Sequence, residues 1–250
     1  MLMSIAAFIA VFTVVVLVHE LGHFLAARRA GVKVYEFSIG FPFSPRIVTL
    51  FRHRETEFTL RLLPLGGFVS FSKDGDDEAA DLFGASIGRR ALIMSAGSFF
   101  NIAFAFLTFI VVFAMGKHMP APDAIAASAK TVWSVISGTV GFIVSAFSGH
   151  GSLEGLAGPV GIAAIAGKAA AKGILNLVYF TGMLSLSLGI MNLIPFPALD
   201  GGQLFMLLIE AIKRKPLSLR TYQVVNLVGM GLFFILTVLV TYKDIAGMFA

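Results

Sequence analysis

The residues with the clearest chemical potential lie near the start of the chain, where residues 19–23 read His-Glu-Leu-Gly-His. This run fits the pattern H-E-x-x-H. On an α-helix, residues four positions apart lie on one face, so the imidazoles of His19 and His23 can bind one Zn²⁺. Glu20 can then reach a water molecule activated by the metal and act as general base. The run therefore predicts a hydrolytic zinc site.

A catalytic zinc site has three protein ligands, and the two histidines provide only two of them. Because the sequence contains no cysteine, a histidine, aspartate or glutamate must supply it. Asp200 is the candidate, since it follows an apolar segment that ends at Pro195 and Pro197. We expect the two glycines after it, Gly201 and Gly202, to let the backbone approach the metal closely.

Both assignments have structural alternatives. His19 and His23 could be core histidines that are hydrogen-bonded to nearby backbone, with Glu20 as their counter-charge. Asp200 could be the N-cap of a short helix over residues 203–212. The metal site is favoured because the two motifs are expected at the same side of a membrane.

The composition indicates an integral membrane protein. Of the 250 residues, 57% are hydrophobic and 13% are charged, whereas soluble domains carry about 25% charged residues. The H-E-x-x-H run ends an apolar stretch long enough to cross a bilayer, where ionisable side chains usually have a function. The net charge of +5 does not indicate nucleic acid, because the basic residues lie beside apolar segments, as in cytoplasmic loops. The expected partner is therefore the lipid bilayer, and no nucleic acid.

The expected fold is α-helical, with about four transmembrane helices, a small membrane-associated β-sheet and an interfacial helical segment between spans 2 and 3. Apolar residues that alternate between prolines and glycines predict short β-hairpins over residues 33–72. Because an open sheet edge cannot face lipid, this sheet should lie at the interface or against the helices. The four spans are expected at about residues 2–27, 91–115, 174–194 and 224–240.

The segment over residues 116–172 has a mixed character. The piece Met119-Pro-Ala-Pro-Asp123 is rich in proline and alanine and indicates a linker. Residues 131–149 could span the bilayer, but their serines and glycines favour an interfacial helix anchored by Trp133. Residues 158–172 are typical of an interfacial or re-entrant segment of small residues. The chain is thus divided into three regions, residues 1–115, 116–172 and 173–250.

Lysine and arginine counts predict the orientation. Residues 28–90 carry ten of them, and the loop before the last span carries four more. The opposite side carries five, which are Lys117, Lys130, Lys168, Lys172 and Lys243. The positive-inside rule then places both basic loops in the cytoplasm and both termini outside. This count requires an even number of spans, and it puts the histidines and Asp200 near the cytoplasmic side.

The motifs together resemble the site-2 protease family of intramembrane zinc metalloproteases. The resemblance rests on H-E-L-G-H in the first span and on the run Asn192-Leu-Ile-Pro-Phe-Pro-Ala-Leu-Asp-Gly-Gly202. Gly158-Pro-Val-Gly161 and the Ala96-Gly-x-x-x-Asn101 pattern also resemble its bacterial branch, which cleaves anti-sigma factors. The match extends over essentially the whole chain.

This resemblance implies roles for particular residues. His19, His23 and Asp200 would hold Zn²⁺, and Glu20 would be the catalytic base. Asn101 and Asn192 would help to hold the substrate or the transition state. The sheet over residues 33–72, with Gly66 and Gly67, would offer an edge to an unwound substrate. The substrate would be a single-pass transmembrane protein, such as an anti-sigma factor or a signal-peptide remnant, in the bacterial inner membrane.

The chain departs from the nearest branch of that family in one respect. Those proteins carry PDZ domains between spans 2 and 3, for which residues 116–130 leave no room. The other functions considered are a cation transporter, which would need polar residues along several spans, and a non-catalytic scaffold that binds membrane proteins. Aspartyl or serine protease chemistry is disfavoured, because Asp200 lacks a partner aspartate within a span and no G-x-S-x-G run occurs.

Overall fold

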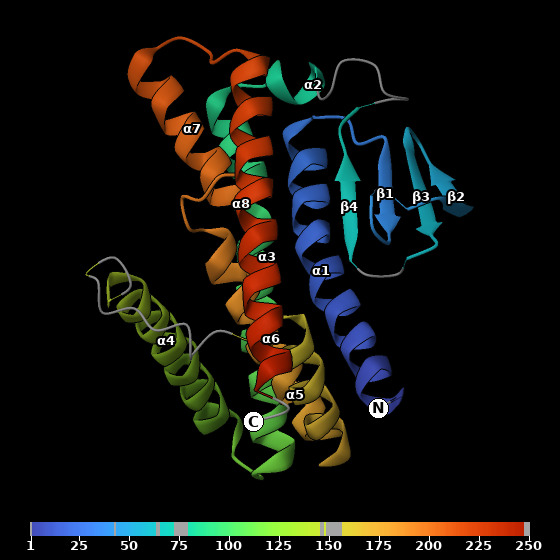
Figure 1. Cartoon of the computed structure of the whole chain (residues 1–250), viewed down its shortest axis with the longest axis vertical. Helices are drawn as coiled ribbons and strands as arrows, with labels where there is room; N and C mark the ends of the chain where they lie inside the picture. Colours follow the sequence, from blue (N-terminus) through green and yellow to red (C-terminus); the bar gives the residue numbers. More distant parts are fainter. Residues whose placement is uncertain are drawn as a thin grey trace.

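The computed structural model describes residues 2–42, 44–63, 66–72, 80–145, 148 and 157–247. Long helices stand side by side, and a small sheet lies against the first of them (Figure 1). In chain order the elements are α1 (Leu2–Ala30), β1 (Glu36–Ile39), β2 (Arg46–His53), β3 (Thr56–Arg61), β4 (Gly67–Ser70), α2 (Ala80–Phe83), α3 (Ile87–Gly116), α4 (Ala121–Ser145), α5 (Pro159–Ala171), α6 (Ile174–Asn192), α7 (Asp200–Lys213) and α8 (Leu219–Ala246).

Helix α3 is the centre of the helical layer, and it packs against α1, α4, α6 and α7. One apolar cluster joins α3 to α6 and includes Phe109 and Leu186, both fully buried. A second cluster joins α1, α3 and the sheet around Phe24 and Ile93. Because apolar side chains also cover the outer faces of the long helices, the bundle is apolar both inside and outside, as lipid-embedded helices are.

Five of the described helices are long and apolar enough to cross a membrane, one more than the four expected. The additional candidate is α4, which begins at Ala121 inside the segment predicted to be a linker. The linker prediction was wrong for a physical reason. Alanine is the strongest helix former, and a proline such as Pro122 is tolerated in the first turn, where its missing N–H leaves no bond unmade.

The chain enters and leaves the region of α4 at the same end of the bundle. Gly116, before α4, lies against Leu175 at the start of α6, and Gly158, after it, lies against Asp244 near the end of α8. Both termini are also at this end (Figure 1). Helices α1, α3, α6 and α8 alone therefore bring the chain back to the end at which it began. Residues 146–156, apart from Ser148, lie outside the described part.

The sheet has the strand order β2-β3-β1-β4. Strands β2 and β3 form an antiparallel hairpin, as expected, but β1 pairs with β3 in parallel. Simple consecutive hairpins would not give this order. Strand β4 pairs antiparallel with β1 and forms the edge next to α1. Phe37 and Phe58 fix the sheet on this helix, with ring centroids 5.5 and 5.7 Å from that of Phe24.

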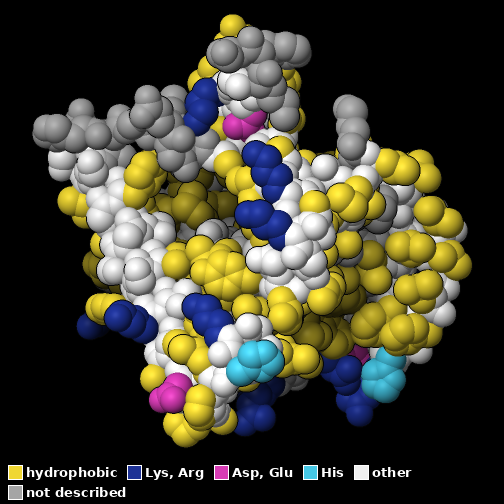
Figure 2. All heavy atoms as spheres, turned by 90° about the horizontal axis from the view of Figure 1, so that it is seen from below, with side chains coloured by type: hydrophobic (Ala, Val, Ile, Leu, Met, Phe, Trp, Pro, Cys, Tyr) yellow, Lys and Arg dark blue, Asp and Glu magenta, His cyan; other side chains and the backbone are white. Residues whose placement is uncertain are grey.

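The opposite edge of the sheet, β2, carries several exposed apolar side chains. Every residue of β2 is exposed, including Ile47, Leu50 and Phe51. Apolar side chains also cover much of the end of the molecule that carries the termini, with Lys and Arg side chains in small separate groups (Figure 2). Such surfaces suit contact with the membrane, at its interface in the case of the open β2 edge, and they agree with a multi-pass membrane protein.

Candidate metal centre and active site

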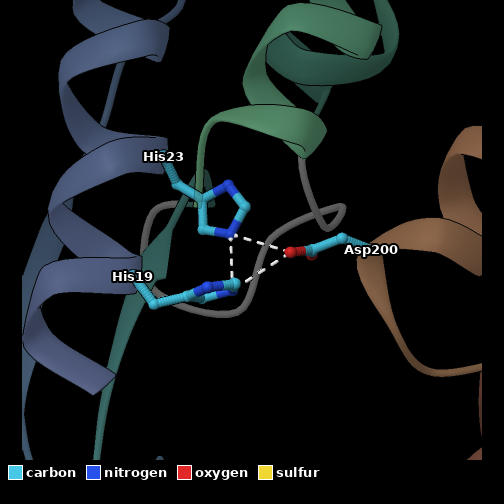
Figure 3. Close-up of side chains that lie close together, drawn as sticks. All are labelled: His19, His23 and Asp200. Atoms are coloured by element: carbon cyan, nitrogen blue, oxygen red, sulfur yellow. Dashed lines mark hydrogen bonds and ion pairs between the residues drawn. The ribbon is translucent and has the colours of Figure 1, made fainter. Parts of the chain in front are cut away.

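Three side chains from two distant parts of the chain meet between α1 and α7. His19 and His23 lie one turn apart on α1, and Asp200 is the first residue of α7 (Figure 3). The Nε2 atoms of the two histidines are 3.1 Å apart. Asp200 Oδ2 lies 3.0 Å from His19 Nε2 and 3.3 Å from His23 Nε2. The structure therefore brings together the three side chains that the sequence analysis predicted as ligands.

The spacing of these atoms fits a tetrahedral metal ion. Ligand atoms about 2.0–2.1 Å from one zinc ion stand roughly 3.3 Å apart in tetrahedral geometry, close to the three distances observed. Among the described residues, no hydrogen bond of acceptable geometry reaches Asp200 Oδ2, although this atom is buried. A buried carboxylate oxygen without such a bond is costly unless a cation neutralises it. The donor set, two imidazoles and one carboxylate, is one that suits Zn²⁺.

Helix α3 supports both imidazoles from the side away from Asp200. The Nδ1 atom of His23 lies 2.7 Å from the carbonyl oxygen of Ile93, and the Nδ1 atom of His19 lies 3.4 Å from Nδ2 of Asn101. Gly97 lies between these contacts. A Cβ at Gly97 would stand 2.5 Å from His23 Nε2 and 2.8 Å from His19 Nε2. Glycine therefore keeps open the space that a metal ion bound by these nitrogens needs.

A cavity of about 370 Å³ opens beside the three ligand atoms. Glu20 lines it, and the backbone amide of Val69 in β4 donates a hydrogen bond to the Glu20 carboxylate. The cavity thus places a potential general base next to the predicted metal ligands. Its other polar and aromatic lining residues include Phe68, Phe71, Asn192 and Gln203.

The segment before Asp200 explains how an aspartate at the end of α6 turns toward α1. The N-cap of α7 is Leu199, so Asp200 belongs to the first helical turn and is not the N-cap. The expectation that Gly201 and Gly202 let backbone approach a metal was wrong. A Cβ at these glycines would stand 2.2 Å from the carbonyl oxygens of Ile194 and Phe196, so they allow the 193–199 loop to fold tightly onto α7.

The four residues predicted to hold substrate lie in different surroundings. Asn192, at the end of α6, lines the cavity. Gly66 and Gly67 lie where the sheet meets α1, and a Cβ at Gly67 would stand 3.6 Å from Cγ of Glu20. Asn101 is fully buried on α3 and is not among the lining residues of the cavity. Their roles toward substrate stay predictions.

The sequence analysis did not identify two of the contacts on α3. Gly97 was noted there only as the glycine of the Ala96-Gly-x-x-x-Asn101 pattern, and Ile93 was given no role. The signal that could have found them is the spacing of positions 93, 97 and 101, which lie on one face of a helix, as His19 and His23 do on theirs.

Comparison with known proteins agrees with this site. The chain matches the model of peptidase family M50 over residues 7–236. A protein of Clostridium perfringens, provisionally named a zinc metalloprotease, is 29% identical over 324 aligned positions, which cover 94% of this chain and 96% of the relative. The zinc metalloprotease RasP of Geobacillus kaustophilus is 26% identical over 417 positions, which cover 98% of each chain. RasP of Shouchella clausii is 40% identical over 112 positions, which cover 45% of this chain and 26% of the relative.

The two long alignments extend over more positions than the 250 residues of this chain, so those relatives contain segments that have no counterpart here. The family match includes both histidines, Glu20 and Asp200. Together with the match over most of its length, this shows that the chain belongs to peptidase family M50, the site-2 protease family.

Proposed function

We propose that this chain is an intramembrane zinc metalloprotease that hydrolyses peptide bonds in the transmembrane segments of other membrane proteins. The observation that carries the proposal is the meeting of His19, His23 and Asp200 at ligand spacing, beside Glu20, in a helical bundle of apolar surface. Family membership supplies the reaction class and the metal. We further propose that His19, His23 and Asp200 are the metal ligands and that Glu20 is the general base.

The chain's residues divide the chemistry between them. A zinc ion held by the three ligands would lower the pKa of water toward 7 and polarise the scissile carbonyl. Glu20 takes the proton of the attacking water and then passes it to the leaving amine nitrogen, so that one water is consumed for each peptide bond cleaved. Asn192, on the cavity wall, is suited to hydrogen-bond to the substrate backbone.

The edge of β4 suits a substrate that has lost its helical structure. An unwound transmembrane segment needs new partners for its N–H and C=O groups inside the membrane. On the side of β1, the carbonyl of Ser70 in β4 accepts a hydrogen bond from the amide of Tyr35, and the carbonyl of Gly66, just before β4, accepts one from the amide of Gly40. Because backbone groups alternate along a strand, those of Val69 face away from β1, toward the cavity. The Val69 amide there donates to Glu20, so its carbonyl is the group that a substrate strand would meet. A substrate strand could pair there by β-augmentation, with Gly66 and Gly67 leaving room at the approach.

The proposed placement follows the charge count and the shared end of the two termini. We infer that the protein lies in a bacterial inner membrane with both termini outside and the active site toward the cytoplasm. The substrate is a single-pass transmembrane protein, for example an anti-sigma factor or a signal-peptide remnant.

The decisive experiment combines metal analysis with a cleavage assay on the purified full chain in detergent or nanodiscs. Glu20→Gln should reduce cleavage of a transmembrane peptide by about 10²–10⁴-fold while zinc stays at one ion per chain, because glutamine keeps the shape but cannot take a proton. The matched control is Asp123→Asn, an exposed carboxylate on α4, which should cleave normally. Near-normal cleavage by Glu20→Gln would refute the base, and zinc flux into liposomes without cleavage would favour a transporter.

A further inference from the structure

One face of α3 follows the two histidines of α1 residue by residue. Ile93, Gly97 and Asn101 are spaced four positions apart, and they oppose His23 and His19 on the neighbouring helix. The carbonyl of Ile93 meets the Nδ1 atom of one imidazole, Gly97 leaves the space at both Nε2 atoms, and Asn101 meets the Nδ1 atom of the other. Ile93 and Asn101 therefore contact the Nδ1 side of the imidazoles, away from Asp200, while Gly97 lies beside the Nε2 atoms that face Asp200.

The contact of Ile93 fixes the protonation of His23. A carbonyl oxygen can only accept a hydrogen bond, so the proton between these atoms, 2.7 Å apart, belongs to Nδ1. In the neutral imidazole, Nε2 then carries a lone pair and faces Asp200 and His19. That is the tautomer that a metal ligand needs, and a hydrogen-bonded outer partner of this kind is a general feature of metal-binding histidines.

Asn101 is placed to do the same for His19, with one difference. Its side chain is fully buried, and its Nδ2 lies 3.4 Å from His19 Nδ1. Its Oδ1 is buried and has no hydrogen-bond partner among the described residues. The hydroxyl of Ser185 on α6 donates a hydrogen bond of 3.0 Å to the backbone carbonyl of Asn101. This bond fixes the position of Asn101. A half-turn of the terminal amide exchanges Nδ2 and Oδ1, which are nearly equal in size.

We propose that Asn101 is a positioning residue of the metal site, whose Oδ1 accepts a hydrogen bond from Nδ1–H of His19 when zinc is bound. This contact fixes the tautomer in which His19 Nε2 is free to bind the metal. In the exchange, Oδ1 gains the hydrogen-bond partner that Nδ2 gives up. The inference rests on the proposed function. It gives Asn101 a role through His19, whereas Asn192, which lines the cavity, keeps the role toward substrate.

The test measures zinc affinity by competition with a chelator, together with the absorption spectrum of the cobalt-substituted protein. Asn101→Leu removes the acceptor at similar volume, and we expect zinc to bind about 10–100-fold more weakly. Asn101→Asp keeps an acceptor and, as a carboxylate, has no donor, so we expect affinity within about threefold of wild type and an unchanged cobalt spectrum. Asn192→Leu should keep zinc affinity but lose cleavage, and Asn176→Leu, an exposed asparagine of α6, should change neither.

The variants separate this inference from the function it rests on. If wild type binds zinc and cleaves, but Asn101→Leu binds zinc as tightly, the positioning role is wrong and the protease assignment stands. If Asn101→Asp loses affinity by tenfold or more, the acceptor role is wrong, and this variant decides the question even when the leucine variant does not fold. A wild-type chain that binds no zinc would overturn both proposals.

Discussion

At the scale of single residues, the site depends on what surrounds the ligands as much as on the ligands themselves. Two imidazoles whose Nε2 atoms face each other at 3.1 Å need either a proton or a cation between them. The outer contacts on α3 hold both rings in that arrangement. Because Gly97 has no side chain, there is room for a metal ion beside the two Nε2 atoms.

Gly97→Ala is therefore expected to empty the site without unfolding the protein. The added methyl would stand 2.5 Å from His23 Nε2 and 2.8 Å from His19 Nε2, where it displaces either the metal or the rings. We expect zinc content to fall at least tenfold in metal analysis, with cleavage lost in parallel. Gly231→Ala on α8 is the matched control, because a Cβ there has no atom within 4 Å. Full zinc content in Gly97→Ala would show that the helices adjust to the methyl.

The two histidines could be predicted because their spacing is local, and Asp200 because of the sequence that precedes it. His19, Glu20 and His23 belong to one helical turn, and Asp200 follows a proline-rich break that marks it out. The structure brings the three predicted ligands together, and their roles stay predictions until metal is measured. The contacts of Gly97 and Asn101 could not be predicted in the same way, because they depend on how α3 is rotated against α1.

At the scale of elements, one buried charge network joins α3, α7 and α8. Arg90 donates to Glu210 at 2.8 Å and to the Tyr222 hydroxyl at 2.8 Å, and that hydroxyl donates to Glu210 at 3.2 Å. The backbone amide of Leu217, in the turn between α7 and α8, also donates to Glu210. The network holds the far end of α7, the helix whose first residue is Asp200. It thereby fixes the direction from which the carboxylate reaches the histidines.

Removing one partner of this network should destabilise the fold strongly. Glu210→Leu leaves the buried guanidinium of Arg90 unpaired, and we expect the free energy of unfolding to fall by about 3–5 kcal/mol in denaturant titrations. The double variant Arg90→Met with Glu210→Leu should recover much of that loss, because no buried charge is left uncompensated. Glu57→Gln, which breaks a partly exposed pair with Arg46, is the control and should cost about 0–1 kcal/mol. Equal effects in the two sites would contradict this account.

The elements themselves were predictable to different degrees. Long apolar runs gave the positions of α1, α3, α6 and α8, and alternation gave a small sheet in the right region. The start of α4 was not predicted, because alanine and proline are compatible both with a linker and with the first turn of a helix. The parallel pairing of β1 with β3 was not predicted either, because strand order depends on packing against α1 and leaves no periodic pattern in the sequence.

At the scale of the whole molecule, the orientation in the membrane is open to a direct test, because the natural sequence contains no cysteine that would need to be removed. Single cysteines at the exposed positions Arg52 and Lys213 should react with an impermeant maleimide only from the cytoplasmic side. Cysteines at Lys117 and Lys172, which are exposed at the opposite end, should react only from outside. Labelling of Arg52→Cys and Lys117→Cys from the same side would contradict the proposed topology.

The distance along the chain between the two histidines and Asp200 has a consequence for biosynthesis. The ribosome adds His23 early in translation, and it must still add residues 24–199 before it reaches Asp200. At ~5–20 residues per second this takes on the order of ten to thirty seconds, during which the growing chain is already entering the membrane with an incomplete donor set. With Asp200 as the proposed third ligand, the nascent protein would be unable to cleave neighbouring proteins until most of the chain has been translated.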